Sequence, residues 1–422
     1  MRIWFLLSFF VVLLIAGLTL VRLQPPKTLR LAAGPSGGAY NQIAEEYRSV
    51  LARDGITLEL VETKGSVENA RLISDHQVDA AILQGGIKVD APEIETIGAL
   101  FFEPMVFLTS AAKTIPGNPA LWKNLAINIG APGSGTAAAY LDFEIAVGLQ
   151  PEANQHFGLS YKQAIAAIKK GKFDLAVFVA PIEAPYLINE YTNAAVRFLP
   201  LDHSEAISRR LEYAKTVTVP TGAISLEPAV PDAPRLLMAL EARMAITPDL
   251  HPALVNRLTM AAIELHNVRG VIMDQGMFPS VEGTGLPVNN VARQLIVNGP
   301  SIWHDWLPYW LASQVHRLVL LMLPLLFIVL PAMRALPQLY AYIMRWRVWQ
   351  HYPEIRAIED KLADVTGESD LMRMDMELVA LDDRLSQIRL PASYRQTAYD
   401  ARMHIELVRN RITEMREDPQ QV

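Results

Sequence analysis

The chain has 422 residues, of which 51% are hydrophobic and 19% are charged, and its formal net charge is −6. This length allows two or three domains, and the high apolar content predicts that part of the chain lies in a membrane. The negative charge gives no sign of a nucleic-acid partner. The absence of cysteine excludes disulfides, thiolate metal sites, cysteine nucleophiles and a cysteine-linked lipid anchor.

The N-terminal segment is the first apolar run. Residues 3–21 are almost wholly apolar and lie between Arg2 and Arg22. A run of this length suits either a signal peptide or a single membrane-spanning helix. No small-residue cleavage pattern follows it, so we favour an uncleaved signal anchor over residues 1–22.

A glycine-rich turn between a strand and a helix is predicted at 29–47. The turn covers 34–38, and the helix is expected to begin near Ala39. Glycine lets the backbone approach a ligand closely and adopt positive φ. The first N–H groups of a helix have no partner inside it and carry the positive end of its dipole. Such a turn is a receptor for a carboxylate or phosphate, although an ordinary tight turn has the same pattern.

A second unit of this kind follows, with a strand at 125–129, a turn at 130–136 and a helix at 137–149. This turn lacks the lysine of a nucleotide-binding P-loop. Pro132 stands where a hydrolase nucleophile elbow around Ser134 would need glycine. We therefore expect neither a nucleotide site nor a hydrolase, and no catalytic, metal or cofactor-binding residue is predicted.

Short apolar runs alternate with amphipathic stretches from residue 29 to about 302, which predicts parallel α/β layers. Strands are expected at 58–62, 78–83, 97–100, 105–109, 173–180, 216–219 and 236–247, and helices at 67–74, 161–170 and 252–266. Ser66 is expected to cap the helix at 67–74. Gln84 follows the strand at 78–83, and Glu103-Pro104 separates two of the strands.

A second membrane segment is predicted near the C-terminus. Aromatic residues gather at 303–310, and residues 318–333 are apolar and uncharged. With flanking residues a spanning helix covers 311–337, whereas a buried core helix is the alternative. The basic residues Arg345 and Arg347 belong on the cytoplasmic side. Both termini would then be cytoplasmic, with residues 22–315 outside the inner membrane.

The tail at 353–418 has apolar residues at helical spacing, interrupted near Gly367 and Pro391. This pattern predicts an α-helical hairpin or coiled coil with charged, solvated faces. The tail is expected to associate with itself or with a cytoplasmic partner.

Several motifs together resemble the TAXI family of solute-binding proteins, which are associated with tripartite ATP-independent periplasmic (TRAP) transporters. They are GPSGGAY (34–40), GSVENARLI (65–73), DAAILQGG (79–86), FFEPMVFL (101–108), IGAPGSGTAAA (129–139) and GKFDLAVFVAPIEAP (171–185). The resemblance covers about 29–300. The stretch from FPS (278–280) through the predicted membrane span to HIELVR (404–409) is similar to the membrane-tethered branch of that family. The opening loop departs from the family, which usually carries more Thr and Gly there.

The resemblance implies an α/β, two-lobed periplasmic-binding-protein-like fold, with membrane helices near both ends and the helical hairpin. Lobe I would be 29–107 and 220–302, and lobe II would be 108–215. A small carboxylate similar to glutamate or 2-oxoglutarate would lie between them. The implied ligand contacts are Gly34, Ser36, Gly37, Gly38, Tyr40, Ser66, Asn69, Gln84, Gly133, Ser134, Gly135, Thr136 and Phe178.

Two functions are consistent with these features. The first is a membrane-tethered receptor that delivers its ligand to a TRAP permease. The second is a sensory or scaffold protein in which the cytoplasmic tail recruits a partner. A typical soluble binding protein needs no cytoplasmic domain, so the tail favours the second function more than the family resemblance does.

Overall fold

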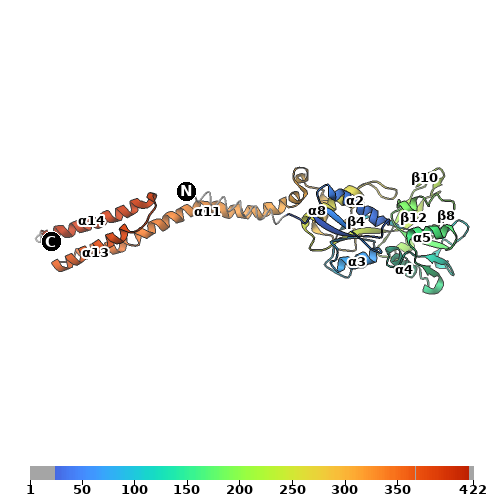
Figure 1. Ribbon diagram of the computed structural model, residues 1–422, viewed down its shortest axis with the longest axis horizontal. Helices are drawn as coiled ribbons and strands as arrows, with labels where there is room; N and C mark the ends of the chain where they lie inside the picture. The colour runs from blue at the N-terminus through green and yellow to red at the C-terminus, as the bar shows by residue number, and fades with distance from the viewer. Residues whose placement is uncertain (1–23, 366, 418–422) are drawn as a thin grey trace. The chain divides into compact units, whose positions relative to one another are not determined.

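The computed structural model describes residues 24–365 and 367–417, so the predicted signal anchor at 1–22 lies outside the described residues. The chain divides into two compact units, one that ends at His316 and one that begins at Arg317. The first unit is a mixed α/β unit, and the second is helical (Figure 1).

The first strands of the α/β unit are parallel. Strand β1 (Thr28–Gly34) pairs with β2 (Thr57–Glu62) and with β3 (Ala80–Leu83). Helix α2 (Ala39–Ala52) buries Ala44, Tyr47, Val50 and Leu51 against this sheet, a spacing that places all four on one face. Helix α3 (Ser66–Ser74) packs on β1 and β3.

Two long antiparallel strands run through both large hydrophobic cores of this unit. They are β4 (Glu95–Ser110) and β12 (Arg235–Ile246). On β4, Phe101 belongs to the first core and Met105 to the second, while on β12 the change lies between Leu240 and Ala242. The predicted separate strands at 97–100 and 105–109 are wrong, because β4 continues through the expected break: β12 pairs with it up to Pro104, and β7 pairs with it from Met105 onward.

The sheet as a whole is mixed rather than all parallel. Its order is β2-β1-β3-β12-β4-β7-β5-β6, and β8 and β9 pair off this path with β4 and β12. The added strands are β5 (Ala126–Asn128), β6 (Gln155–Phe157), β7 (Leu175–Val179), β8 (Val196–Phe198) and β9 (Ala214–Val219). The prediction of parallel layers fails at β4 and β12, because these two strands run antiparallel to their neighbours β3, β7 and each other.

Helix boundaries in this unit follow local signals closely. The expected helix at 252–266 is α8 (Pro252–His266), with proline in its first turn. Helix α4 (Gly135–Val147) ends where Gly148 adopts φ 76°, the left-handed conformation that glycine adopts without strain. The other elements are η1 (Pro119–Leu121), η2 (Pro151–Ala153), α5 (Tyr161–Lys169), α6 (Pro185–Ile188), α7 (Ser204–Ser208), β10 (Ser225–Leu226), β11 (Ala229–Val230), α9 (Asn290–Asn298), η3 (Ile302–Asp305) and α10 (Tyr309–Ala312).

The C-terminal part begins with α11 (Val315–Trp349), which contains Pro324, Pro331 and Pro337. The helix expected at 311–337 therefore begins later, at Val315, and continues to Trp349. In the described part of the chain, one helical stretch, Leu326–Leu362, is long and apolar enough to cross a membrane by length and composition.

The tail forms three further helices, α12 (Tyr352–Leu362), α13 (Glu368–Ser386) and α14 (Arg395–Glu417), with η4 (Ala392–Tyr394) before the last. Helices α13 and α14 lie side by side (Figure 1). Their inward residues Leu378, Leu381, Leu385, Ile405 and Ile412 share one core with α12 and the end of α11. The apolar spacing in the tail thus marks residues that pack together.

Candidate functional site

The first glycine-rich turn joins β1 to α2. Gly34 and Gly37 have φ of 79° and 73°, which a side chain would strain. Gly38, in contrast, has φ −78° and is the residue before the first turn of α2, and its N–H donates to the Pro35 carbonyl at 3.0 Å. Gly37 is therefore the glycine that needs positive φ. Gly38 does not, but it packs closely against Pro35.

The second turn joins β5 to α4. Ser134 caps this helix, because its Oγ accepts a hydrogen bond from the N–H of Ala137 at 3.2 Å. Thr136 Oγ1 accepts one from the N–H of Val179 at 3.3 Å. Both hydroxyls, which were predicted to contact ligand, therefore also hold the turn and the neighbouring strand in place.

The two turns meet around one small cavity. Gln84 Nε2 donates a hydrogen bond to the carbonyl of Gly135 at 2.8 Å, and Ser66 Oγ accepts one from the N–H of Gln84 at 3.1 Å. The cavity has a volume of about 30 Å³, enough for a few atoms. Five predicted ligand residues line it: Gly38, Tyr40, Ser66, Gln84 and Gly135.

Ser66 differs from its expected role as a helix cap. Gly65, with φ 135°, occupies the capping position of α3, and Ser66 is the first residue of the helix. The Ser66 side chain bonds instead to the main chain at Gln84. Ser66 and Gln84 thus tie the start of α3 to the end of β3 beside the cavity.

Glu103 lies at the cavity and is 2% exposed. The hydroxyl of Tyr40 donates a hydrogen bond to Glu103 Oε2 at 2.7 Å. Burial raises the pKa of Glu103 to about 8, and the bond from Tyr40 opposes this rise only in part. The carboxyl group is therefore mostly protonated near neutral pH when no cation lies beside it.

Two further tyrosines line the cavity. The rings of Tyr161 on α5 and Tyr186 on α6 stack, with centroids 4.8 Å apart and an interplanar angle of 10°. The buried hydroxyl of Tyr186 has no hydrogen-bond partner among residues 24–365 and 367–417. Such a group is costly to bury unpaired and is available to a ligand.

A larger groove adjoins the cavity. It has a volume of about 720 Å³, and Pro35 and Tyr161 line both spaces. Lys64, Ser134 and Ser160 line the groove as well. An organic ligand would extend from the cavity into this groove, because the cavity alone is too small for one.

Other predicted ligand residues lie outside the lining of the cavity. Ser36 donates its N–H to Glu62 Oε1 at 3.0 Å, and Phe178 is fully buried in the core beneath α5. Gly34, Gly37, Gly133 and Thr136 shape the two turns. Asn69 is also fully buried, and its Nδ2 donates to the carbonyls of Ala32 at 3.3 Å and Ile82 at 2.8 Å.

We expect Asn69→Ala to reduce stability more than it reduces ligand affinity. The substitution leaves two buried main-chain carbonyls of β1 and β3 without these donors, which costs about 1–3 kcal/mol. Chemical denaturation should show this loss. A variant with parental stability and no ligand affinity would instead give Asn69 a direct role in binding.

Glu103, Tyr161 and Tyr186 line the cavity but are not among the predicted ligand residues. Pro35, Ala39, Gly65 and Val179 complete the lining. The one local signal was a single acidic residue inside the apolar run FFEPMVFL, because a carboxylate on a buried strand needs a partner or a function.

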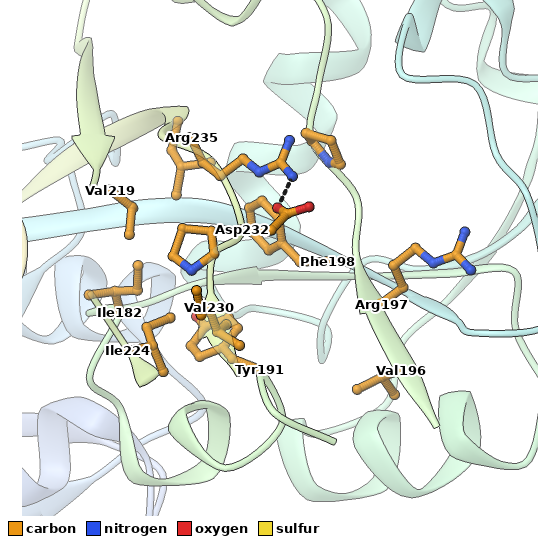
Figure 2. Close-up of a pocket in the computed structure, with 14 residues that line it drawn as sticks. Ile182, Tyr191, Val196, Arg197, Phe198, Val219, Ile224, Val230, Asp232 and Arg235 are labelled. Carbon is orange, nitrogen blue, oxygen red and sulfur yellow. Dashed lines mark hydrogen bonds and ion pairs between the residues drawn. The ribbon is translucent and has the colours of Figure 1, made fainter. Parts of the chain in front are cut away.

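A second pocket, of about 500 Å³, lies beside the β10–β11 hairpin. Figure 2 shows the apolar side chains of Ile182, Ile224 and Val230 on its wall and the ion pair between Asp232 and Arg235. None of the predicted ligand residues lines this pocket. Across residues 24–365 and 367–417, no cluster of three or more His, Asp or Glu residues is arranged to hold a metal ion.

A known protein family matches the α/β unit. The model of the NMT1-like family matches residues 31–267, more than half of the chain. No curated protein matches the chain significantly.

Solved structures similar to the chain include three binding proteins. The periplasmic aliphatic sulphonate-binding protein SsuA from Escherichia coli is 15% identical, with a TM-score of 0.38, over 57% of this chain and 72% of that one. The alkanesulfonate-binding SsuA from Xanthomonas axonopodis pv. citri, bound to MOPS, is 13% identical, with a TM-score of 0.37, over 57% and 73%. An ancestral arginine-binding protein bound to arginine is 10% identical, with a TM-score of 0.39, over 57% and 93%.

The family match begins within β1 and ends just beyond α8, so it contains both glycine-rich turns, Glu103 and the tyrosines around the cavity. The chain therefore belongs to the NMT1-like family.

Proposed function

We propose that the protein is a membrane-tethered, extracytoplasmic receptor that captures a small carboxylate-bearing ligand for a TRAP-type transporter, as the resemblance to the TAXI family implies. The observation that carries this proposal is the cavity on which both glycine-rich turns converge. Gly38 at the start of α2 and Gly135 at the start of α4 both line it.

The chemistry of the two turns suits a carboxylate. The first N–H groups of α2 and α4 lie at the positive ends of their helices, where an anion is stabilised. In a two-lobed receptor with lobe I at 29–107 and 220–302 and lobe II at 108–215, each turn belongs to a different lobe. A ligand that bonds to both turns would hold the lobes closed, and the Gln84–Gly135 hydrogen bond already joins them.

We expect Gly38→Val to abolish binding of the best ligand from a thermal-shift screen of small carboxylates. A Cβ at Gly38 lies 3.0 Å from the Pro35 carbonyl oxygen, so the larger side chain must move the turn or fill the cavity. Ser134→Ala should weaken binding by about 0.5–3 kcal/mol. Calorimetry measures the affinities.

Melting temperatures are the control for these two variants, because Ser134→Ala also removes a helix cap and costs about 1 kcal/mol of stability. Parental affinity in both variants would place the ligand elsewhere.

The proposed tether predicts a topology that reporter fusions can test. A reporter placed after residue 300 should be extracytoplasmic, and one placed at the C-terminus should be cytoplasmic, because the basic residues beyond the apolar part of α11 favour the cytoplasmic side. A cytoplasmic reporter after residue 300 would contradict this topology.

A second candidate function is ligand sensing or scaffolding through the tail. The specific observation is the shared core of α12, α13 and α14, a folded helical part that ligand delivery does not require. Deletion of 353–418 from the full chain distinguishes the two functions. Unchanged ligand uptake with a lost cellular response would favour sensing, whereas lost uptake would assign the tail to transport.

A further inference from the structure

We propose that Glu103 binds an ammonium group, so that the ligand of this receptor is a 2-amino acid rather than a carboxylate that lacks an amine. This inference rests on the proposed receptor function and assigns its ligand class. Three observations support the inference: the charge of the cavity, the oxygen atoms around the cavity, and the size of the cavity relative to the adjoining groove.

The charge of the cavity comes from a single group. Among the lining residues Glu103 carries the one carboxyl group, and none of the others is Lys, Arg or His. A carboxylate that is 2% exposed is expensive to ionise without a cation beside it. The protein itself supplies the hydroxyl of Tyr40, which leaves the place of the cation to a ligand.

The surrounding oxygen atoms suit the three hydrogens of an ammonium group. Glu103 accepts hydrogen bonds, and the buried Tyr186 hydroxyl has no partner in the part of the chain that the structure describes. Tyr161 also lines the cavity, and its ring stacks on that of Tyr186. An ammonium group bonded to Glu103 and Tyr186 would satisfy both buried groups.

The sizes of the cavity and the groove determine which end of the ligand lies at Glu103. A cavity of about 30 Å³ accepts an ammonium group but not the body of an amino acid. The groove that shares Pro35 and Tyr161 with the cavity also contains Lys64, Ser134 and Ser160. Glu62 and Glu68 line it too, and their carboxylates accept hydrogen bonds from the N–H groups of Ser36 and Lys64. A ligand with its ammonium at Glu103 therefore has its carboxylate in the groove, near the start of α4 and a lysine.

The competing reading is a protonated Glu103 that donates a hydrogen bond to a ligand oxygen. The titratable groups that face Glu103 are Tyr40 on α2, Tyr161 on α5 and Tyr186 on α6, and burial keeps all three neutral at pH 7. Proton release separates the two readings. An ammonium ligand requires the carboxylate and releases the Glu103 proton to solvent, whereas an oxygen acceptor leaves that proton in place.

Calorimetry on the detergent-solubilised full chain tests the proposal at pH 7 with matched 2-amino and 2-oxo acids. The pairs are L-glutamate with 2-oxoglutarate, L-leucine with 4-methyl-2-oxopentanoate and L-phenylalanine with phenylpyruvate. Each titration is run in two buffers of different ionisation enthalpy. We expect an amino acid to bind about 30-fold or more tightly than its oxo acid and to release close to one proton.

Glu103→Gln supplies the matched variant, because glutamine retains the shape and an acceptor for Tyr40 but cannot carry a negative charge. It should weaken amino-acid binding by about 30-fold or more and abolish proton release. Glu59→Gln, at an exposed position on β2, is the control and should leave both unchanged.

Equal or tighter binding of the oxo acids, or parental amino-acid affinity in Glu103→Gln, would overturn the ammonium assignment and leave the carboxylate receptor standing. Binding of neither series to the parental chain would overturn both the assignment and the proposed ligand class.

Discussion

The ligand-free Glu103→Gln variant should be more stable than the parental protein at pH 8. The pKa of Glu103 rises from 4.5 to about 8 on folding because the side chain is buried. The folded chain therefore keeps its proton over a pH range in which the unfolded chain releases it. The contribution of the protonated Glu103 carboxyl to the free energy of unfolding is fully present below pH 4.5 and is lost as the pH rises through about 8.

The expected size of this loss is at most about 5 kcal/mol, and the Glu103→Gln variant is free of it because an amide does not titrate. Denaturation at pH 4.5 and at pH 8 should show a parental protein that loses stability with rising pH and a Glu103→Gln variant that loses less. Glu59→Gln is again the control. An identical pH dependence in the parental chain and Glu103→Gln would mean that Glu103 is ionised in the folded protein.

Gly135→Ala should prevent the two turns from packing as they do in the parental structure. An added Cβ would lie 2.5 Å from Gln84 Oε1 and 3.2 Å from Gln84 Cβ. Gln84 is 2% exposed, so its side chain cannot move aside without breaking the hydrogen bond to the Gly135 carbonyl. We expect a stability loss of about 1–3 kcal/mol and a loss of ligand affinity.

The double variant Gln84→Ala/Gly135→Ala tests this explanation. Removal of the Gln84 amide removes the nearest clash, so the second substitution should cost less in the Gln84→Ala background than in the parental chain. Denaturation of all four proteins gives the coupling energy. Additive effects would show that Gly135→Ala acts through α4 itself rather than through Gln84.

Much of the local structure was predictable because its signals lie close together in the chain. The strand, glycine-rich turn and helix at each site were predicted from short apolar runs and adjacent glycines, and the ends of α4 and α8 follow Gly148 and Pro252. The one-piece strand β4 was not predictable, because its two halves pair with β12 up to Pro104 and with β7 from Met105, and both partners are distant in sequence.

The candidate site was predictable only in part. Gly38, Tyr40, Ser66, Gln84 and Gly135 line the cavity as expected from the two turns. The Asn69 amide could bond to a ligand as readily as the Gln84 amide could. In the structure, however, it donates to main-chain carbonyls on β1 and β3. Whether a polar residue meets a ligand or the main chain depends on strands that are distant in sequence.

The sequence by itself determined that two helix starts with glycine-rich turns are present, that one acidic residue lies between two apolar runs, and that the tail has helical apolar spacing. The tertiary structure decided that both turns, Glu103, Tyr161 and Tyr186 surround one cavity. The physical reason is that turn chemistry and helix caps are local, whereas burial of a carboxyl group depends on every element that packs around it.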